Sequence, residues 1–225
     1  MVTVYCIALT LFAYGVSRML ASRYPSPFTT PVFLSSILII LVLIFSGVEA
    51  RDYEPAKNVL VFLLGPATVA LALPIYRNRS RLAAHLAPTL GGIAVGSLAT
   101  VLATLALGKL LGLAQPVLAS MSTKSVTAPI AIQLAEIVRG DPSLAVAFVI
   151  VTGMLGAMFG PALLTFAGIV QPLARGLSLG TISHGQGTAQ AIAEGEVQGA
   201  IAGIAMGLAA IMTSLGLPFL IDLLP

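Results

Sequence analysis

The chain has 225 residues, of which 58% are hydrophobic and only 8% are charged. A soluble domain carries about 25% charged residues, because most of its surface must face water. The 11 basic and 8 acidic residues of this chain cannot form such a surface, so the composition excludes a soluble globular fold and predicts a protein embedded in lipid. The net charge of +3 is small, and we expect it to reflect membrane topology rather than nucleic-acid binding.

Uncharged runs divide the chain into candidate membrane segments, which cover residues 1–17, 24–48, 58–76, 82–108, 142–174 and 197–221. Each run is close to or above the roughly 17–25 residues that a helix needs to cross the hydrocarbon core. The alternation of apolar and polar residues over about 10 positions that is typical of membrane β-barrels does not occur. We predict an all-α polytopic membrane protein with about six to eight membrane segments, organised as a single domain over residues 1–225.

The first run predicts a membrane span that is retained. Residues 1–17 lack a basic n-region, and no A-x-A type of cleavage site follows them. Cys6 is the sole cysteine, and His85 and His184 lie far apart. The sequence therefore offers no intrachain disulfide and no usual metal-ligand spacing, and we expect neither a metal nor another cofactor.

Basic residues between the runs predict the orientation, because cytoplasmic loops are enriched in lysine and arginine. The densest cluster is Arg77-Asn-Arg-Ser-Arg81, for which binding of anionic lipid is the alternative interpretation. If the spans alternate and residues 115–138 also cross, one side collects Arg18, Arg23, Arg77, Arg79, Arg81 and Arg139, and the other collects Arg51, Lys57, Lys109 and Arg175. We expect the first side to be cytoplasmic and the N-terminus to lie outside.

Three segments interrupt the apolar sequence with glycine or proline and small hydroxyl residues. They are Gly65-Pro66-Ala-Thr68, residues 122–129 and residues 181–189. Proline removes a backbone donor and glycine tolerates unwound backbone, and in lipid the freed polar groups need protein or a water-filled cavity. The pattern predicts discontinuous or re-entrant helices; ordinary kinks with small residues for close helix packing are the alternative.

The spacing of these breaks suggests an internal repeat. Gly65, Ser125 and Gly185 stand 60 residues apart. When residues 123–136 are overlaid on residues 181–194, five of fourteen positions are identical. Paired broken helices that meet near the membrane midplane are typical of internally repeated transporters.

Lys124 is the most informative residue of the second break. An intramembrane lysine costs a few kcal/mol on insertion scales and normally faces a cavity or a partner. Ser125 and Thr127 surround it with hydroxyls, and Pro129 suits the first turn of a helix running to Glu136. A lysine, hydroxyls and the N-terminal amides of a helix together predict a site for a carboxylate. The alternative is a lysine that snorkels to the membrane interface.

His184 dominates the third break, where Ser183, Gly185, Gly187 and Thr188 surround it. The glycines allow backbone to approach whatever the imidazole contacts. In a membrane segment such a histidine can bind an anion or relay a proton. A histidine that is bonded only to a neighbouring carbonyl is the alternative.

The acidic residues carry less information. Residues 49–57 mix both signs of charge and predict a solvated loop, and we also expect Glu194 to be solvated. Glu136 is a candidate for proton coupling, although a local ion pair with Arg139, three residues on, explains both residues without function.

An intramembrane hydrolase is a further alternative. Its nucleophile and base would have to be Ser125 and His184 brought together by folding, because the side chains of adjacent Ser183 and His184 diverge on a helix. No G-x-S-x-G motif supports this chemistry. We therefore predict that the protein is not an enzyme.

Several segments carry a specific combination of motifs: Phe62-Leu-Leu-Gly-Pro-Ala-Thr and its continuation to Ala72, Lys124-Ser-Val-Thr-Ala-Pro-Ile-Ala131, Phe148 to Ala157, Ala174-Arg-Gly-Leu-Ser-Leu-Gly-Thr-Ile-Ser-His-Gly-Gln-Gly-Thr-Ala189, and Ala205-Met-Gly-Leu208. Together they resemble the LrgB/CidB family, also called YohK-like, over nearly the whole chain. The resemblance implies a multi-pass protein of the bacterial inner membrane that is often paired with a small LrgA/CidA-type membrane protein. It implies either transport of small monocarboxylates such as pyruvate and glycolate, or antiholin-like control of murein hydrolase export and autolysis.

Two positions depart from the family pattern. Thr123 stands where the family usually has a proline before the lysine, which softens the break. Gln190 stands where the family often has an arginine, so an anion site here would depend more heavily on Lys124.

The residues and the resemblance together predict a transporter of small 2-keto or 2-hydroxy monocarboxylates. Lys124, Ser125 and Thr127 would hold the carboxylate, while His184 and Thr188 would contact the keto or hydroxyl oxygen, with His184 protonating during the cycle. Gly65, Pro66 and Thr68 would add backbone from the first break. Small residues at Gly199, Gly203 and Gly207 permit close contacts within or between protomers, and we expect a homodimer in a lipid membrane.

Overall fold

The computed structural model describes residues 2–70 and 72–222, and in this part of the chain regular structure is helical throughout. Helices α1 (Val2–Arg23), α7 (Leu86–Leu110), α10 (Pro142–Phe166) and α12 (Glu196–Asp222) have the length and apolar composition needed to cross a membrane. The predicted all-α polytopic membrane fold is confirmed. The chain divides into two compact units, Met1–Ala72 and Leu73–Pro225, which are described separately; the single-domain organisation stays a prediction.

In the first unit, α1 packs against α2 (Pro31–Ser46) and α3 (Ala50–Phe62). A short 3-10 helix, Pro27–Thr29, connects α1 to α2, and Gly47 ends α2 in the left-handed conformation with φ 69°. The interior face of α1 is made of small residues: Cys6, Ala13 and Ser17 are buried. Thr10 and Tyr53 share a hydrogen bond of 2.7 Å between α1 and α3.

The prediction of a loop over residues 49–57 is wrong, because these residues open α3, although most of them are exposed as expected. Glu49 and Asp52 form reciprocal capping contacts at its first turn, and Asp52 also places negative charge at the positive end of the helix. The break predicted at Gly65-Pro66 is confirmed: α3 ends at Phe62, and α4 (Leu64–Ala70) begins two residues later, with Pro66 in its first turn.

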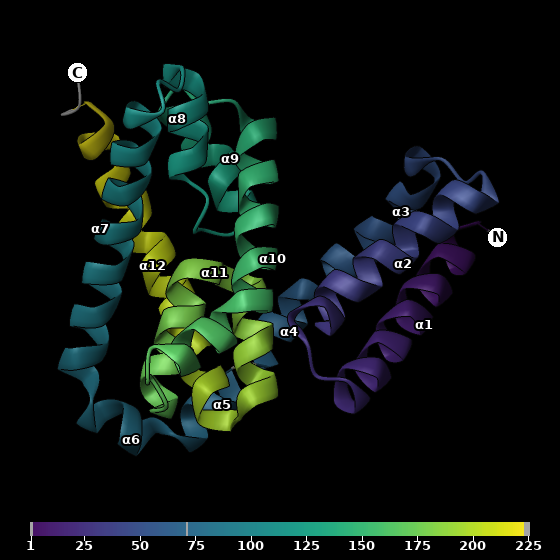
Figure 1. Cartoon of the computed structure of the whole chain (residues 1–225), viewed down its shortest axis with the longest axis horizontal. Helices are drawn as coiled ribbons and strands as arrows, with labels where there is room; N and C mark the ends of the chain where they lie inside the picture. The colour runs from purple at the N-terminus through teal and green to yellow at the C-terminus, as the bar shows by residue number, and fades with distance from the viewer. Residues whose placement is uncertain (1, 71, 223–225) are drawn as a thin grey trace. The chain divides into compact units, whose positions relative to one another are not determined.

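The second unit begins with the short helices α5 (Ala72–Arg77) and α6 (Arg79–Ala84) and contains three long helices, α7, α10 and α12. Within this unit, Figure 1 shows α8 (Gln115–Ser122) and α9 (Ala128–Ile137) at one end of the long helices, while α11 (Pro172–Glu194) enters from the other end. These shorter helices form two hairpins that point toward each other. We call residues 115–137 hairpin 1 and Pro172–Glu194 hairpin 2.

Hairpin 1 returns to the side from which it starts. Leu118 and Ala119 of α8 share a buried cluster with Leu134 of α9 and with Val138, which directly follows α9. The Asp141 N–H at the start of α10 donates to the Ser120 hydroxyl over 2.7 Å. At 1.5 Å per residue, helices of 8 and 10 residues measure about 12 and 15 Å, which is half of a hydrocarbon core of about 30 Å. We therefore expect the tip of hairpin 1, residues 123–127, to lie near the middle of the membrane.

Hairpin 2 is more sharply folded, because α11 reverses within itself. Ser183 and His184 depart from helical geometry, and His184 has φ 40° and ψ −128°. Arg175 and Glu194 would lie about 28 Å apart on a continuous helix, yet their side chains form an ion pair of 2.7 Å. The two arms of α11 therefore run antiparallel, with Ser183 and His184 at the tip. The prediction of discontinuous, re-entrant helices is confirmed for both later breaks.

The reversals correct the assumption that residues 115–138 cross the membrane. Because hairpin 1 re-enters, Lys109 and Arg139 lie at the same end of the second unit. Helix α10 then leads back to the end at which α7 begins, so Arg175 joins the side of Arg77 and its neighbours. Simple alternation of spans predicts the reverse, with Arg139 on the side of Arg77 and Arg175 on the side of Lys109.

Glycines let hairpin 2 approach its neighbours closely. A Cβ on Gly176 or Gly180 would collide with the backbone of α12 at Gln198 and Ala202, respectively. On α10, Gly156 faces Ser183 of the tip, where an added Cβ would also collide. Such backbone contact provides van der Waals packing between helices. This packing holds helices together in lipid, where the hydrophobic effect does not drive their association.

Candidate functional site

The two hairpin tips converge on the same helices of the second unit. On α10, Val149 packs in one buried cluster with Val126 of hairpin 1, and its carbonyl oxygen lies 3.0 Å from His184 Nε2 of hairpin 2. On α7, the Thr100 hydroxyl lies 3.4 Å from the Ser125 hydroxyl of hairpin 1. One turn earlier, the methyl group of Thr181 from hairpin 2 lies 3.2 Å from the Cβ position of Gly96. The second and third breaks therefore share one region between α7 and α10.

Lys124 extends from the tip of hairpin 1 onto α7. Its ammonium group donates to the hydroxyls of Thr104 and Thr100 over 2.5 and 3.0 Å, and it lies 3.5 Å from the Thr100 carbonyl oxygen. Three acceptors match the three donors of an ammonium group. Among the described residues no carboxylate lies within ion-pair distance of Lys124, and the side chain does not snorkel toward an end of the helices. The structure thus holds a positive charge inside the helical unit without a counter-ion from the described residues.

The remaining residues of the hairpin 1 tip form the start of α9. Ser125 is buried, and Thr127 occupies the N-cap position of α9 without a side-chain capping bond. Pro129 lies in the first turn of α9, as predicted. The first N–H groups of a helix lack partners within the helix, so those of α9 present partial positive charge at the tip.

Thr100 and Thr104 hold Lys124 in the structure, and the sequence interpretation missed them. They lie within the uncharged run 82–108, where two threonines attract little attention. Their spacing was the available signal: Ser97, Thr100 and Thr104 recur at intervals of three and four residues, which puts their side chains on one face of a helix. A polar stripe on an apolar span normally faces protein or a cavity.

His184 forms the tip of hairpin 2 in an unusual conformation. A positive φ is uncommon for any residue other than glycine and often marks a functional or constrained site. The imidazole is buried against α10, where a Cβ on Gly153 would lie only 2.6 Å from Cε1 and 2.7 Å from Nε2. Its bond to Val149 is the carbonyl contact that the alternative interpretation anticipated, although the carbonyl belongs to a different helix.

The neighbours of His184 have different roles in this structure. Ser183 is buried against Gly156, and Gly187 lets the second arm approach Leu179 of the first arm. The Thr188 hydroxyl is buried and donates to the His184 carbonyl over 2.8 Å, so it is occupied by protein. Gly185 is exposed. Roles of these residues in binding stay predictions.

Polar atoms without partners lie beside both tips. In the described part of the chain, Ser97 Oγ, Thr181 Oγ1 and Gln186 Oε1 are buried and have no hydrogen-bond partner. Most buried polar groups in proteins are bonded. Ser122 illustrates the usual solution in a helix, since its hydroxyl donates to the Leu118 carbonyl four residues earlier. Unused polar atoms of this kind are available to a small polar ligand or to water.

Four other candidate residues remain. Glu136 is exposed at the end of α9, and no ion pair joins it to Arg139, because Arg139 leaves the helix with φ 59°; that predicted pair is wrong. Gly65 and Pro66 belong to the first unit, and the Thr68 side chain lies outside the described residues. Their part in a site stays a prediction.

The structure also bears on the hydrolase alternative. Ser125 is paired with Thr100, whereas His184 is bonded to Val149. No hydrogen bond between Ser125 and His184 occurs in the described residues. The arrangement required for a serine nucleophile and a histidine base is not formed.

Fold and site together define a helical membrane protein with two opposed re-entrant hairpins and a half-buried lysine at the tip of one of them. Comparison with known proteins agrees: the model of the LrgB-like family matches residues 10–223. The chain belongs to this family. It is 35% identical to the Bacillus subtilis protein named "Uncharacterized protein YxaC", over 95% of this chain and 93% of that protein.

Relatives with a descriptive name are found in staphylococci. "Holin-like protein CidB" of Staphylococcus epidermidis is 30% identical over 97% of this chain and 95% of its own length. The protein of the same name from Staphylococcus aureus is also 30% identical, over 96% of this chain and 94% of its own length. No solved structure matches the chain. The predicted family resemblance is confirmed.

Proposed function

We propose that this protein is a membrane carrier for small monocarboxylate anions, which bind between the tips of hairpins 1 and 2. The observation that supports this proposal most strongly concerns Lys124. Its ammonium group is held inside the helical unit by Thr100 and Thr104, and no carboxylate of the described residues lies within ion-pair distance of it. A charge in such a place is unfavourable unless it is compensated. A bound anion supplies the missing counter-charge.

The backbone supports an anion at the same place. The second arm of each hairpin begins at the tip, so the N-terminal ends of both arms face the region between the hairpins. Each helix N-terminus carries a partial charge of roughly +0.5. Half-helix N-termini that point at an anionic substrate near the membrane midplane are a recurring feature of transporters.

The chemistry of the tips favours a small substrate with a second oxygen beside the carboxylate. Both tips rest on Val149 of α10, which packs in one cluster with Val126 of hairpin 1 and whose carbonyl oxygen contacts His184 of hairpin 2. The Thr181 hydroxyl can donate to a keto or hydroxyl oxygen, whereas Gln186 Oε1 and the second ring nitrogen of a neutral His184 can accept from a hydroxyl. This supports 2-keto or 2-hydroxy acids, with Lys124 and Ser125 on the carboxylate.

Charge also supports an orientation for the second unit in a bacterial inner membrane. The end with Arg77, Arg79 and Arg81 also holds Arg175, whereas the opposite end holds Lys109 and Arg139. The positive-inside rule places the more basic end in the cytoplasm. Hairpin 2 then re-enters from the cytoplasm and hairpin 1 from outside, which lets each tip gate the shared site from one side.

Uptake by purified protein in liposomes tests the proposal. We expect saturable uptake of labelled pyruvate, lactate or glycolate by the native protein and none by Lys124→Gln. Lys57→Ala is the matched control, because Lys57 is exposed and paired only with Glu54 three residues away. The proposal fails if the native protein carries none of a broad panel of monocarboxylates, or if Lys124→Gln carries them normally.

The holin-like name of the staphylococcal relatives favours a second candidate function. It is antiholin-like control of murein hydrolase export and autolysis, exerted together with an LrgA/CidA-type membrane partner. A regulator that opens pores would release a trapped dye from the same liposomes, alone or together with the partner. A carrier releases no dye while it transports the anion.

A further inference from the structure

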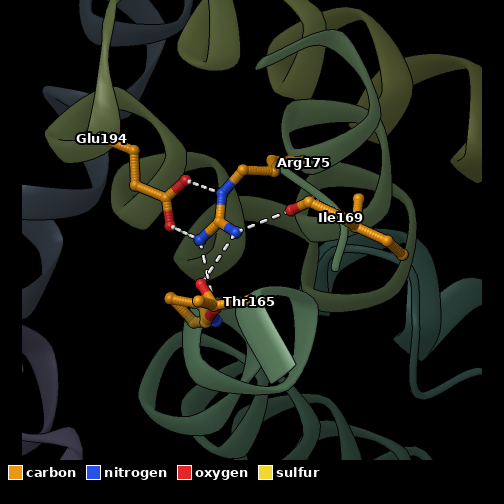
Figure 2. Close-up of polar contacts among 5 residues, drawn as sticks. Thr165, Ile169, Arg175 and Glu194 are labelled. Atoms are coloured by element: carbon orange, nitrogen blue, oxygen red, sulfur yellow. Dashed lines mark hydrogen bonds and ion pairs between the residues drawn. The ribbon is translucent and has the colours of Figure 1, made fainter. Parts of the chain in front are cut away.

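Arg175 and Glu194 join the two arms of hairpin 2 at its base, on the side away from the tip. Arg175 Nε lies 2.7 Å from Glu194 Oε2, and one terminal nitrogen, Nη2, lies 2.9 Å from Oε1, so the pair is bidentate (Figure 2). Both side chains are largely enclosed, with 12% and 15% of their surface exposed. Glu194 is therefore not solvated, contrary to the sequence-based expectation, because the reversal at His184 brings it to a cation 19 residues away.

The same guanidinium group also binds the end of α10. Its Nη1 donates to the Thr165 hydroxyl over 3.1 Å and to the Ile169 carbonyl over 2.9 Å (Figure 2). Its Nη2 donates to the Pro161 carbonyl over 3.1 Å. With the two bonds to Glu194, all five N–H donors of the guanidinium group are used. One side chain thus joins both arms of hairpin 2 and the helix on which its tip rests.

This base and the tip are mechanically connected. Arg175 precedes Ser183 by eight residues, or about 12 Å of helix, and Ser183 and His184 rest on Gly156 and Gly153 of α10. The tip holds His184 in the left-handed region, a conformation that persists only where surrounding contacts impose it. The contacts at the base supply part of that constraint, since they fix where both arms start along α10.

We propose that Arg175 is a positioning residue of the carrier: with Glu194 and the end of α10 it closes the base of hairpin 2 and thereby places Ser183 and His184 at the anion site. The inference rests on the proposed function of that site. It assigns to a residue remote from the substrate a role in substrate affinity, which a purely structural ion pair would not have.

Two variants separate positioning from stability. Arg175→Lys keeps the charge but can make at most three hydrogen bonds and cannot bind Glu194 in a planar fork. The double variant Arg175→Met with Glu194→Met removes both charges together, an exchange that often leaves stability unchanged. We expect both to fold and insert, with KM for the carried anion raised at least 10-fold, while Lys57→Ala keeps the native KM.

Hydrogen exchange provides a readout that does not require transport. In lipid nanodiscs we expect amides of residues 178–190 to exchange at least 5-fold faster in Arg175→Lys than in the native protein, with amides of hairpin 1 unchanged. Native KM together with native exchange in both variants would overturn the inference while leaving the carrier intact. Absence of uptake by the native protein would instead refute the proposed function, and faster exchange of hairpin 2 alone would then show that the clamp is structural.

Discussion

The two hairpins of the second unit both bring polar groups to a tip among the long helices, but they do so by different means. Hairpin 1 turns through five residues, 123–127, and its distinctive feature is a charge. This charge is the ammonium group of Lys124, which is bonded to α7. Hairpin 2 turns at Ser183 and His184 alone, and its distinctive feature is a constrained backbone. His184 at the tip has a positive φ, and an ion pair closes the base. The difference suggests a division of work, in which hairpin 1 attracts the anion and hairpin 2 fits it.

The largest effect is expected from removing the charge of hairpin 1. Lys124→Met keeps much of the side-chain volume but leaves no ammonium group for an anion. We expect kcat/KM for uptake to fall at least 100-fold, which corresponds to about 3 kcal/mol of transition-state stabilisation. Lys124→Arg keeps the charge and should retain part of the activity. If Lys124→Met transports at a rate close to the native protein, hairpin 1 does not act through charge.

A methyl group placed under the tip of hairpin 2 tests its dependence on shape. Gly156→Ala forces the new Cβ into Ser183, so the tip must move. Overpacking of this kind costs about 1–3 kcal/mol, and we expect uptake to fall roughly 10-fold or more with it. Gly91→Ala on α7 is the control, because its Cβ would meet no atom within 4 Å. Equal behaviour of the two variants in uptake and thermal unfolding would show that the tip tolerates displacement.

A smaller effect is expected from the hydroxyls that hold Lys124. Thr104→Val and Thr100→Val each remove an acceptor from the ammonium group. A hydrogen bond to a charged group contributes about 1.5–3 kcal/mol, so each change should shift KM by roughly 10-fold. Ser122→Ala serves as control within hairpin 1, since that hydroxyl bonds its own helix. A shift in KM from Ser122→Ala as large as from Thr104→Val would point to general loosening of the hairpin.

The smallest effect is expected at Glu136. It is exposed at the outer end of α9 and makes no ion pair with Arg139. We expect Glu136→Gln to change the uptake rate by less than about twofold, within the range of most surface substitutions, and to leave its pH profile in place. Loss of the pH dependence in this variant would establish the proton-coupling role that the sequence suggested and that position in the fold does not favour.

The sequence predicted the helical membrane fold and the breaks, because each depends on local chemistry. Length and apolarity define spans, and Pro129 in the first turn of a helix follows from its fixed φ and missing N–H. Hydroxyls around Lys124 could be recognised for the same reason. The side chains that accept from it, Thr100 and Thr104, lie on another helix and were not recognised.

Chain reversal could not be predicted from these patterns. A run of apolar residues looks the same whether it crosses or returns, and the reversal of hairpin 2 depends on the conformation of Ser183 and His184. Everything that follows from the reversal was therefore also missed. The sequence predicts a solvated Glu194 because its partner, Arg175, is distant in sequence. It also assigns Arg139 and Arg175 each to the opposite side of the membrane from the one that the fold indicates.

The central claim is that the Lys124 ammonium group, at the tip of hairpin 1, binds a carboxylate. Equilibrium binding of labelled pyruvate to the purified protein in nanodiscs tests it most directly, with Lys124→Gln and Lys57→Ala measured in parallel. We predict saturable binding of one anion per chain to the native protein and to Lys57→Ala, and none to Lys124→Gln. Equal binding to all three proteins would contradict the claim.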